Sequence, residues 1–140
     1  MSTEANKAVS RRFHQLFDAG DIEGIGREVL DLSVVVHFPG SPGPVNHDGF
    51  KQLGQMFQAA FPDHQTTIED QIAEGDLVVT RTMFRGTHQG ELQGIPPTGK
   101  PVAVSGITID RIAGGKIVER WDEFDQVGML QQIGAIPMPA

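Results

Sequence analysis

In three stretches of the first 61 positions, hydrophobic residues recur every three or four residues, a spacing typical of amphipathic helices. This spacing predicts a first helix over residues 4–19, which ends at Gly20. Asp21 is suited to cap a second, shorter helix, because its side chain can accept hydrogen bonds from the free amides of the first turn. A third helix is predicted over 48–61, and Pro62 prevents it from continuing.

A β-branched run at 33–38 predicts one early strand, which leads into a proline-rich loop. After His64 the hydrophobic residues alternate with polar ones, which is typical of half-buried strands. The connections between the later strands are short and contain glycine, so we expect hairpins and an antiparallel meander. The later strands are predicted over residues 66–73, 77–87, 102–112 and 116–125, followed by one or two helical turns over 127–133.

Three helices followed by a meander indicate an α+β fold. A chain of 140 residues has the length of one domain, so we expect residues 1–140 to form a single unit. A sheet that curves around helices leaves a cavity between the two layers, and concave apolar cavities of this kind bind small molecules. We therefore expect a pocket for a small hydrophobic molecule.

Composition narrows the available chemistry. The chain has no cysteine and no tyrosine, which excludes disulfides, thiolate nucleophiles and a phenol as oxyanion donor. Acidic residues outnumber basic ones 18 to 11, giving a net charge of −7, so no nucleic-acid partner is expected. No apolar run approaches the roughly 20 residues that cross a membrane, and we expect a cytoplasmic protein. No two histidines have metal-ligand spacing, so no metal site is expected.

Two segments, residues 85–102 and 115–134, carry the motifs Arg-Gly-Thr-His-Gln-Gly-Glu, Gly-Ile-Pro-Pro-Thr-Gly-Lys-Pro-Val and Glu-Arg-Trp-Asp-Glu-Phe-Asp. With these motifs the chain resembles the SnoaL-like polyketide cyclase (ester cyclase) family of the NTF2-like superfamily. The resemblance implies a cone in which a strongly curved, mostly antiparallel sheet wraps around three N-terminal helices, with a deep pocket open at one end. It also implies a homodimer or higher homo-oligomer, formed through the outer face of the sheet.

The same resemblance implies an activity. Characterised members of the family close the last ring of anthracycline precursors by an intramolecular aldol condensation, without a cofactor or a metal ion. An aspartate on a late strand acts there as acid and base. For this chain we expect a cofactor-free enzyme of the polyketide cyclase type, or a related lyase or isomerase, that acts on a hydrophobic carbonyl compound.

The last predicted strand offers two aspartates for that role. By strand alternation Glu119, Trp121 and Asp125 share one face, while Arg120 and Asp122 share the other. The tryptophan and aspartate that recur in the family match Trp121 and Asp125, so we expect this face to line the pocket and Asp125 to transfer protons. Alternatively, Asp125 caps the C-terminal segment. Asp122 is the second candidate, since a β-bulge would exchange the two faces.

Histidine supplies one further catalytic candidate. His37 ends the first strand at the expected rim of the pocket, where it could polarise a substrate carbonyl or, alternatively, bond to the backbone. His88 lies in the Gly-Thr-His motif, where a structural or interface contact competes with substrate binding. The remaining histidines, His14, His47 and His64, are predicted to lie on the surface.

Charged residues inside predicted strands can face either side of the sheet. Arg81 interrupts an apolar strand, so it either pairs with a carboxylate in the pocket or faces solvent on the outer face. Asp110 and Arg111 are interpreted as a surface pair. The predicted substrate-binding residues are Phe17, Met56, Phe57, Phe61, Arg81, His88, Glu119 and Trp121.

Three further functions compete with the cyclase interpretation. Ketosteroid isomerase-like chemistry in its usual form uses a tyrosine, which this chain lacks. Epoxide hydrolysis in relatives with this fold uses an Asp-Arg-Asp arrangement that activates water, and Arg120 and Asp122 share a face here. A small-molecule-binding protein without turnover would need the pocket alone.

Overall fold

The computed structural model describes residues 2–137, and its helices and strands match the predicted elements in order and type. Within that range no helix is long and apolar enough to cross a membrane. The helices are α1 (Thr3–Asp18), α2 (Ile22–Glu28), α3 (His47–Ala60) and α4 (Gln126–Gln132). The strands are β1 (Leu30–His37), β2 (Gln65–Glu74), β3 (Leu77–Thr87), β4 (Pro101–Ala113) and β5 (Lys116–Phe124).

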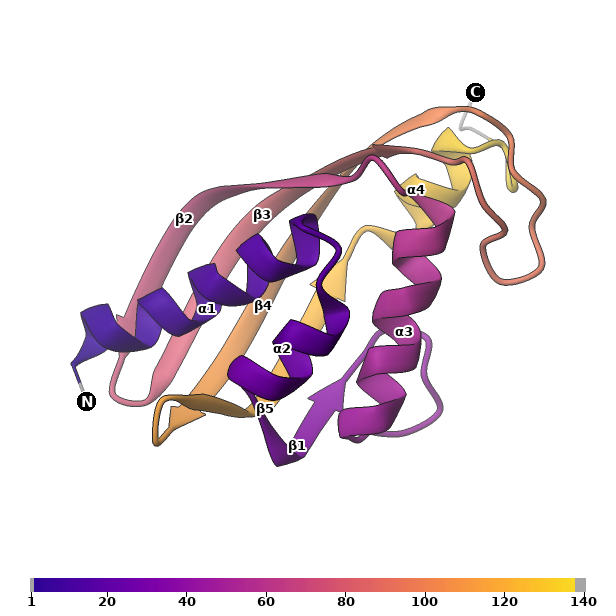
Figure 1. Ribbon diagram of the computed structural model, residues 1–140. Helices are drawn as coiled ribbons and strands as arrows, with labels where there is room; N and C mark the ends of the chain where they lie inside the picture. The colour runs from indigo at the N-terminus through magenta and orange to yellow at the C-terminus, as the bar shows by residue number, and fades with distance from the viewer. Residues whose placement is uncertain (1, 138–140) are drawn as a thin grey trace.

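The five strands form one sheet in the order β1-β5-β4-β3-β2. Strands β2 to β5 make the predicted antiparallel meander, and β1 joins the edge of the sheet parallel to β5. Figure 1 shows the sheet bending along its length, with α1, α2 and α3 gathered on one face and α4 following β5. The predicted α+β architecture, a curved and mostly antiparallel sheet around three N-terminal helices, is confirmed.

Each helix begins at a side chain that caps it. Ser2, Asp21, Asn46 and Asp125 accept hydrogen bonds from backbone amides in the first turns of α1, α2, α3 and α4, respectively. Such caps satisfy amides that have no partner inside the helix, and each contributes about 1 kcal/mol. The starts of the helices are therefore encoded locally in the sequence.

The inner face of the sheet packs against the helices in two hydrophobic clusters. One lies under α1 and α2 and includes Phe13, Ile25 and Val34. The other lies where α3 and α4 meet the sheet and includes Phe61 and Met129. The candidate site described below is lined by members of both clusters.

The outer face of the sheet carries exposed apolar side chains. Ile72 on β2 and Ile107 on β4 expose 67% and 48% of their surface, and Val35 on β1 is also exposed. Large exposed apolar side chains that gather on one face are common at protein interfaces. Association of two copies through this face stays a prediction.

Candidate active site

A pocket lies between the inner face of the sheet and helices α1 and α3, and it encloses about 120 Å³. For comparison, an engineered apolar cavity of about 150 Å³ binds benzene. Two glycines in the lining, Gly54 and Gly106, keep side-chain volume out of this space. The aromatic wall includes Phe13, Phe17, Phe50, Phe57, Phe84 and Phe124. The polar lining consists of His14, Thr66, Thr82, Thr108, Arg120 and Asp122.

A β-bulge in β5 decides which face of that strand lines the pocket. Ile117 pairs with Ile112 on β4, but the next pair on the ladder joins Glu119, so Val118 is an extra residue. One extra residue exchanges the two faces of a strand. Ile117 and Arg120 are therefore both buried, although strict alternation would place them on opposite faces.

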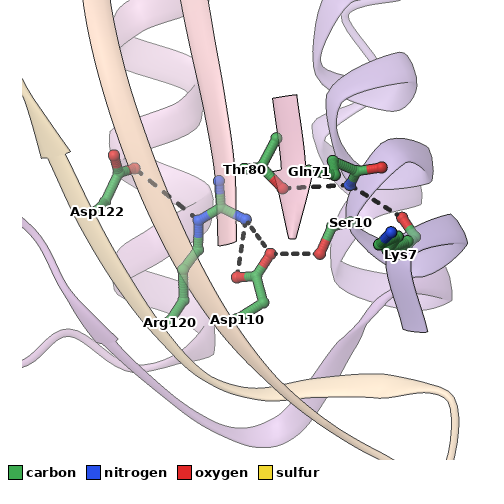
Figure 2. A network of polar contacts seen from close by, with 7 residues as sticks. All are labelled: Lys7, Ser10, Gln71, Thr80, Asp110, Arg120 and Asp122. Carbon is green, nitrogen blue, oxygen red and sulfur yellow. Dashed lines mark hydrogen bonds and ion pairs between the residues drawn. The ribbon is translucent and has the colours of Figure 1, made fainter. Parts of the chain in front are cut away.

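Arg120 is the centre of a buried ion pair with Asp110, and the two side chains expose 1% and 0% of their surface. The Arg120 Nη1 donates to both carboxylate oxygens of Asp110, at 3.1 and 3.2 Å. The hydroxyl of Ser10 donates to the same carboxylate at 2.8 Å. Figure 2 shows the three side chains converging from α1, β4 and β5. Buried charges cost several kcal/mol each unless they are paired and hydrogen-bonded, so these contacts fasten α1 to the sheet.

The aromatic ring of Phe13 covers the guanidinium group of Arg120. The Arg120 Cζ lies 3.8 Å from the centre of the ring. Cations are attracted to the face of an aromatic ring, most strongly where water is excluded. Ser10 and Phe13 are three residues apart on α1, so a single helix face holds both the anion and the cation of the pair.

Asp122 is the carboxyl group that faces the pocket. Its Oδ2 lies 3.9 Å from the Arg120 Nε, which is an ion-pair contact but too long for a hydrogen bond. Its side chain keeps 19% of its surface accessible, whereas Asp110 is closed off completely. Figure 2 shows Asp122 on the opposite side of the guanidinium from Ser10.

The two carboxyl groups share one cation. Burial raises the pKa of Asp122, Arg120 opposes this, and the negative charge of Asp110 adds to the rise. Burial also raises the pKa of Asp110, but Arg120 and the Ser10 hydroxyl oppose it with hydrogen bonds to the ionised form. Since Asp122 has no such hydrogen bonds among the described residues, it is the carboxyl group of the two that binds a proton more readily.

His14 adds a neutral imidazole to the pocket. It lies on α1 beside Phe13 and exposes only 8% of its surface. Burial, reinforced by the charge of Arg120, lowers the pKa of His14 to about 3. The imidazole therefore carries no charge at neutral pH, where it can donate or accept a hydrogen bond.

Asp125, the first catalytic candidate, lies outside the pocket. Its carboxylate accepts a hydrogen bond from the Gly128 amide at 2.9 Å and caps α4. The expectation that its face of β5 lines the pocket is wrong, because the bulge turns that face outward. The second candidate on this strand, Asp122, is the one at the pocket.

Three more candidates, from that face of β5 and from its neighbour β1, lie on the outer side of the sheet. His37 stacks on Trp121 with ring centres 5.3 Å apart, and its Nε2 lies 2.8 Å from a carboxylate oxygen of Glu119. Arg111 reaches over the Trp121 ring from β4. The expectation that His37, Glu119 and Trp121 contact a substrate in the pocket is wrong, because none of them is in its lining.

Arg81 faces solvent, which is the second of the two positions expected for it. It is exposed on the outer face and pairs with Asp70 on β2, with 2.6 Å between the Nη2 and the Oδ2. Phe61 and Met56, also predicted to bind substrate, are not in the lining of the pocket. Phe61 is fully buried in the hydrophobic cluster where α3 and α4 meet the sheet, and Met56 packs against that cluster. Phe17 and Phe57 do line the pocket.

His88 has a structural role in the fold. It is fully buried, its Nδ1 lies 3.0 Å from the Thr98 hydroxyl, and its ring is near that of Phe61. The backbone of His88 also pairs with Lys100 and Gly99, so it anchors both ends of the loop that carries the Gly-Ile-Pro-Pro-Thr-Gly motif.

Three residues predicted at the surface are buried instead. His64 exposes 3% of its surface and lies between the carbonyl groups of Phe61 and Phe17. Asp110 and His14 belong to the site itself. For Asp110 a signal was available, because it shares an alternating face with Val104, Thr108 and Ile112, all of them buried.

No three His, Asp or Glu side chains of residues 2–137 are placed to hold a metal ion together. The polar groups of the pocket comprise one cation, one carboxyl group, one imidazole and three threonine hydroxyls. Function without a cofactor stays a prediction.

We predict that Arg120→Met lowers the free energy of unfolding by about 3–5 kcal/mol, since removal of one partner leaves a buried charge uncompensated. Denaturant unfolding at pH 7 measures the change. Arg81→Met is the matched control, because it breaks an exposed pair and should change stability little. Equal losses in the two variants would contradict the account of the buried pair.

We also predict that His14 makes the fold sensitive to acid. The folded chain keeps this imidazole neutral down to about pH 3, whereas the unfolded chain protonates it below about pH 6.5. Between these two pH values His14 takes up a proton when the chain unfolds. Acid therefore favours the unfolded state. From pH 7 to pH 4.5, wild type should lose about 2–3 kcal/mol more stability than His14→Gln, as measured by urea unfolding. Parallel pH profiles for the two proteins would show that His14 titrates normally in the fold.

Comparison with known proteins places this chain in a family. The model of the family described as SnoaL-like polyketide cyclase matches residues 7–133. The aklanonic acid methyl ester cyclase DnrD of Streptomyces peucetius is 27% identical to the chain, over 96% of the chain and 92% of DnrD.

Solved structures agree with that match. IdmH from Streptomyces antibioticus, described as a candidate polyketide cyclase, shares 37% identity and a TM-score of 0.83, over 92% of this chain and 98% of IdmH. AclR from Streptomyces galilaeus, described as a candidate hydroxylase, shares 28% identity and a TM-score of 0.89, over 99% of this chain and 87% of AclR. The chain belongs to the SnoaL-like polyketide cyclase family.

Proposed function

We propose that this protein is a cofactor-free, polyketide cyclase-like enzyme that carries out aldol-type acid/base chemistry on a hydrophobic carbonyl compound. One observation carries the proposal. Asp122 is a carboxyl group with a raised pKa, set in an aromatic pocket and held beside a single buried cation. Buried carboxyl groups whose pKa is shifted toward neutrality are suited to transfer protons at physiological pH.

The chemistry needs a proton acceptor and then a proton donor. Ionised Asp122 removes a proton from a carbon next to a substrate carbonyl, which leaves an enolate. The enolate carbon attacks a second carbonyl carbon of the same molecule, so a C–C bond forms and the second oxygen becomes an alkoxide. The alkoxide takes the proton from Asp122, which returns to its ionised form, and no external reactant is consumed.

Arg120 supports both proton transfers from a fixed position. Its guanidinium is fixed by Asp110 and Phe13, so its charge does not move when Asp122 gains or loses a proton. A fixed charge in a site that excludes water stabilises developing negative charge at little reorganisation cost. Arg120 is therefore a positioning residue for the Asp122 carboxyl group.

Two further features support this class of substrate. Among the described residues, seven phenylalanine side chains line the pocket, and such a lining favours a flat, apolar molecule. DnrD, which resembles the chain over nearly its full length, is named an aklanonic acid methyl ester cyclase.

The test uses aklanonic acid methyl ester as the substrate. An aldol addition within one molecule leaves the mass unchanged, so the product is separated by chromatography and identified by its absorption spectrum. We predict that Asp122→Asn reduces the rate of cyclisation about 100-fold or more. Asp125→Asn is the matched control, because asparagine also caps helices and this residue lies outside the pocket.

Each outcome has a definite meaning. Loss of turnover in Asp122→Asn with activity kept in Asp125→Asn supports the proposal. Loss of turnover in Asp125→Asn with activity kept in Asp122→Asn would identify Asp125 as the acid/base. Binding of the ester by wild type without any cyclisation would favour a small-molecule-binding protein.

Epoxide hydrolysis is the second candidate, because Asp110, Arg120 and Asp122 form an Asp-Arg-Asp arrangement. Hydrolysis of that kind needs one carboxyl group to activate water and another to protonate the opening ring. Asp110 is closed off from the pocket and bonded to Ser10, so only one carboxyl group is available there. This placement favours the cyclase proposal.

The two candidates are separated with styrene oxide in water enriched in oxygen-18. We predict no diol above the rate in buffer alone. Formation of labelled diol by wild type, and its loss in both Asp122→Asn and Asp110→Asn, would establish the second candidate in place of the first. Denaturant unfolding of Asp122→Asn and Asp110→Asn checks that loss of diol is not caused by unfolding.

A further inference from the structure

Polar atoms without a partner collect in the pocket. Five buried side-chain atoms of residues 2–137 have no hydrogen-bond partner within the protein. Three of them, the His14 Nε2, the Thr108 Oγ1 and the Arg120 Nε, belong to residues that line the pocket. A buried polar atom without a partner costs about 1–3 kcal/mol. Such atoms in one cavity indicate that something in the cavity completes their hydrogen bonds.

Thr108 lies directly beside the proposed acid/base. It pairs with Asp122 across the ladder between β4 and β5, so the two side chains are neighbours on the inner face of the sheet. The Thr108 hydroxyl nevertheless makes no hydrogen bond to that carboxyl group or to any other described residue. An oxygen atom of a ligand held next to Asp122 is therefore within reach of this hydroxyl.

His14 faces the same cavity from the helix layer. It is 8% exposed, its Nε2 is unpartnered, and Arg120 is close enough to disfavour its charged form. A neutral imidazole next to a guanidinium can serve a ligand oxygen without adding a second positive charge. The phenyl ring of Phe13, whose centre lies 5.3 Å from that of the imidazole, offers no hydrogen bond.

We propose that His14 and Thr108 form a polar subsite that binds one hydroxyl or carbonyl oxygen of an aromatic ligand, next to Arg120 and Asp122. A hydroxyl group fits either tautomer of the imidazole, because it can both donate and accept. A carbonyl oxygen fits when the Nε2 carries the hydrogen. The subsite selects ligands whose ring carries oxygen at the edge that faces α1. This subsite depends on the proposed function only in that the ligand is then called a substrate.

The probes are phenol and toluene, which have the same ring and differ by a hydroxyl in place of a methyl group. Dissociation constants for both are measured by NMR titration in wild type, His14→Phe and Thr108→Val. Loss of one hydrogen bond should raise the ratio of the phenol constant to the toluene constant about fivefold in each variant. Both constants are measured in the same variant, so a change in pocket shape that weakens phenol and toluene equally does not alter their ratio.

Matched controls lie outside the pocket. His47→Gln alters a histidine bonded to a backbone carbonyl, and Thr87→Val removes a hydroxyl bonded to Asp63. Both should keep the wild-type ratio. His14→Gln, which again offers a donor and an acceptor near the position of the Nε2, should restore part of the preference for phenol.

A second measurement needs no variant of His14. In wild type labelled with nitrogen-15, phenol should shift the resonance of the His14 Nε2, and toluene should shift it much less. Thr108→Val keeps the β-branched shape of the side chain and serves if His14→Phe does not fold.

An unchanged ratio in either His14→Phe or Thr108→Val, or equal resonance shifts with the two probes, overturns the shared subsite. Failure of both probes to bind at millimolar concentration overturns it as well. The ratio does not depend on turnover, so an inactive protein with the predicted ratios would refute the cyclase proposal and leave the subsite intact.

Discussion

The buried pair between Asp110 and Arg120 is the interaction on which the site depends. Two opposite charges without access to water are tolerated only because each has further contacts, from Ser10 on one side and Phe13 on the other. Both of these residues lie on α1, so the position of this helix and the state of the pair are coupled. If the pair is broken, the helix loses its polar attachment to the sheet.

The same pair determines the chemistry of the pocket. Asp110 receives the hydrogen bonds that stabilise an ionised carboxylate, and Asp122 shares the cation without receiving any from the described residues. Two carboxyl groups beside one cation are not equivalent, because the group with fewer hydrogen bonds to its ionised form binds a proton more readily. The site therefore separates a structural carboxylate from a reactive carboxyl group, although the two are on adjacent strands. The aromatic wall lowers the local dielectric constant, which makes both effects stronger.

The sequence predicted the order and type of the elements because their signals are local. Helix caps such as Asp21, glycine turns and strand alternation each depend on a few neighbouring residues. The choice of the pocket face on the last strand, which rested on the family motif, was wrong, because the bulge at Val118 places Arg120 on the buried side together with Ile117. Both faces of that strand carry charged and aromatic residues, so composition could not correct the error. The resemblance in motifs pointed to Trp121, which the fold places on the outer side with His37.

Local sequence patterns also did not reveal that the charged network is buried. Whether Arg120 can be buried depends on Asp110, ten residues away, and on Ser10 in another element. A pattern for His14 was present, since Ser10, His14 and Phe17 follow the spacing of one helix face. The sequence does not distinguish this face from a polar surface, because only the folded structure shows that it covers the pocket.

The protonation of Asp122 is the most direct test of the central claim. Carbon-13 NMR of labelled aspartate carboxyl groups, titrated between pH 3 and pH 9, gives the pKa of each aspartate, and Asp122→Asn identifies the resonance. The account predicts that Asp122 titrates well above the ordinary value of about 3.9 for aspartate. A pKa at or below that value would contradict it, because Asp122 would then be only a second ionised partner of Arg120 and not a group that readily takes up and releases a proton.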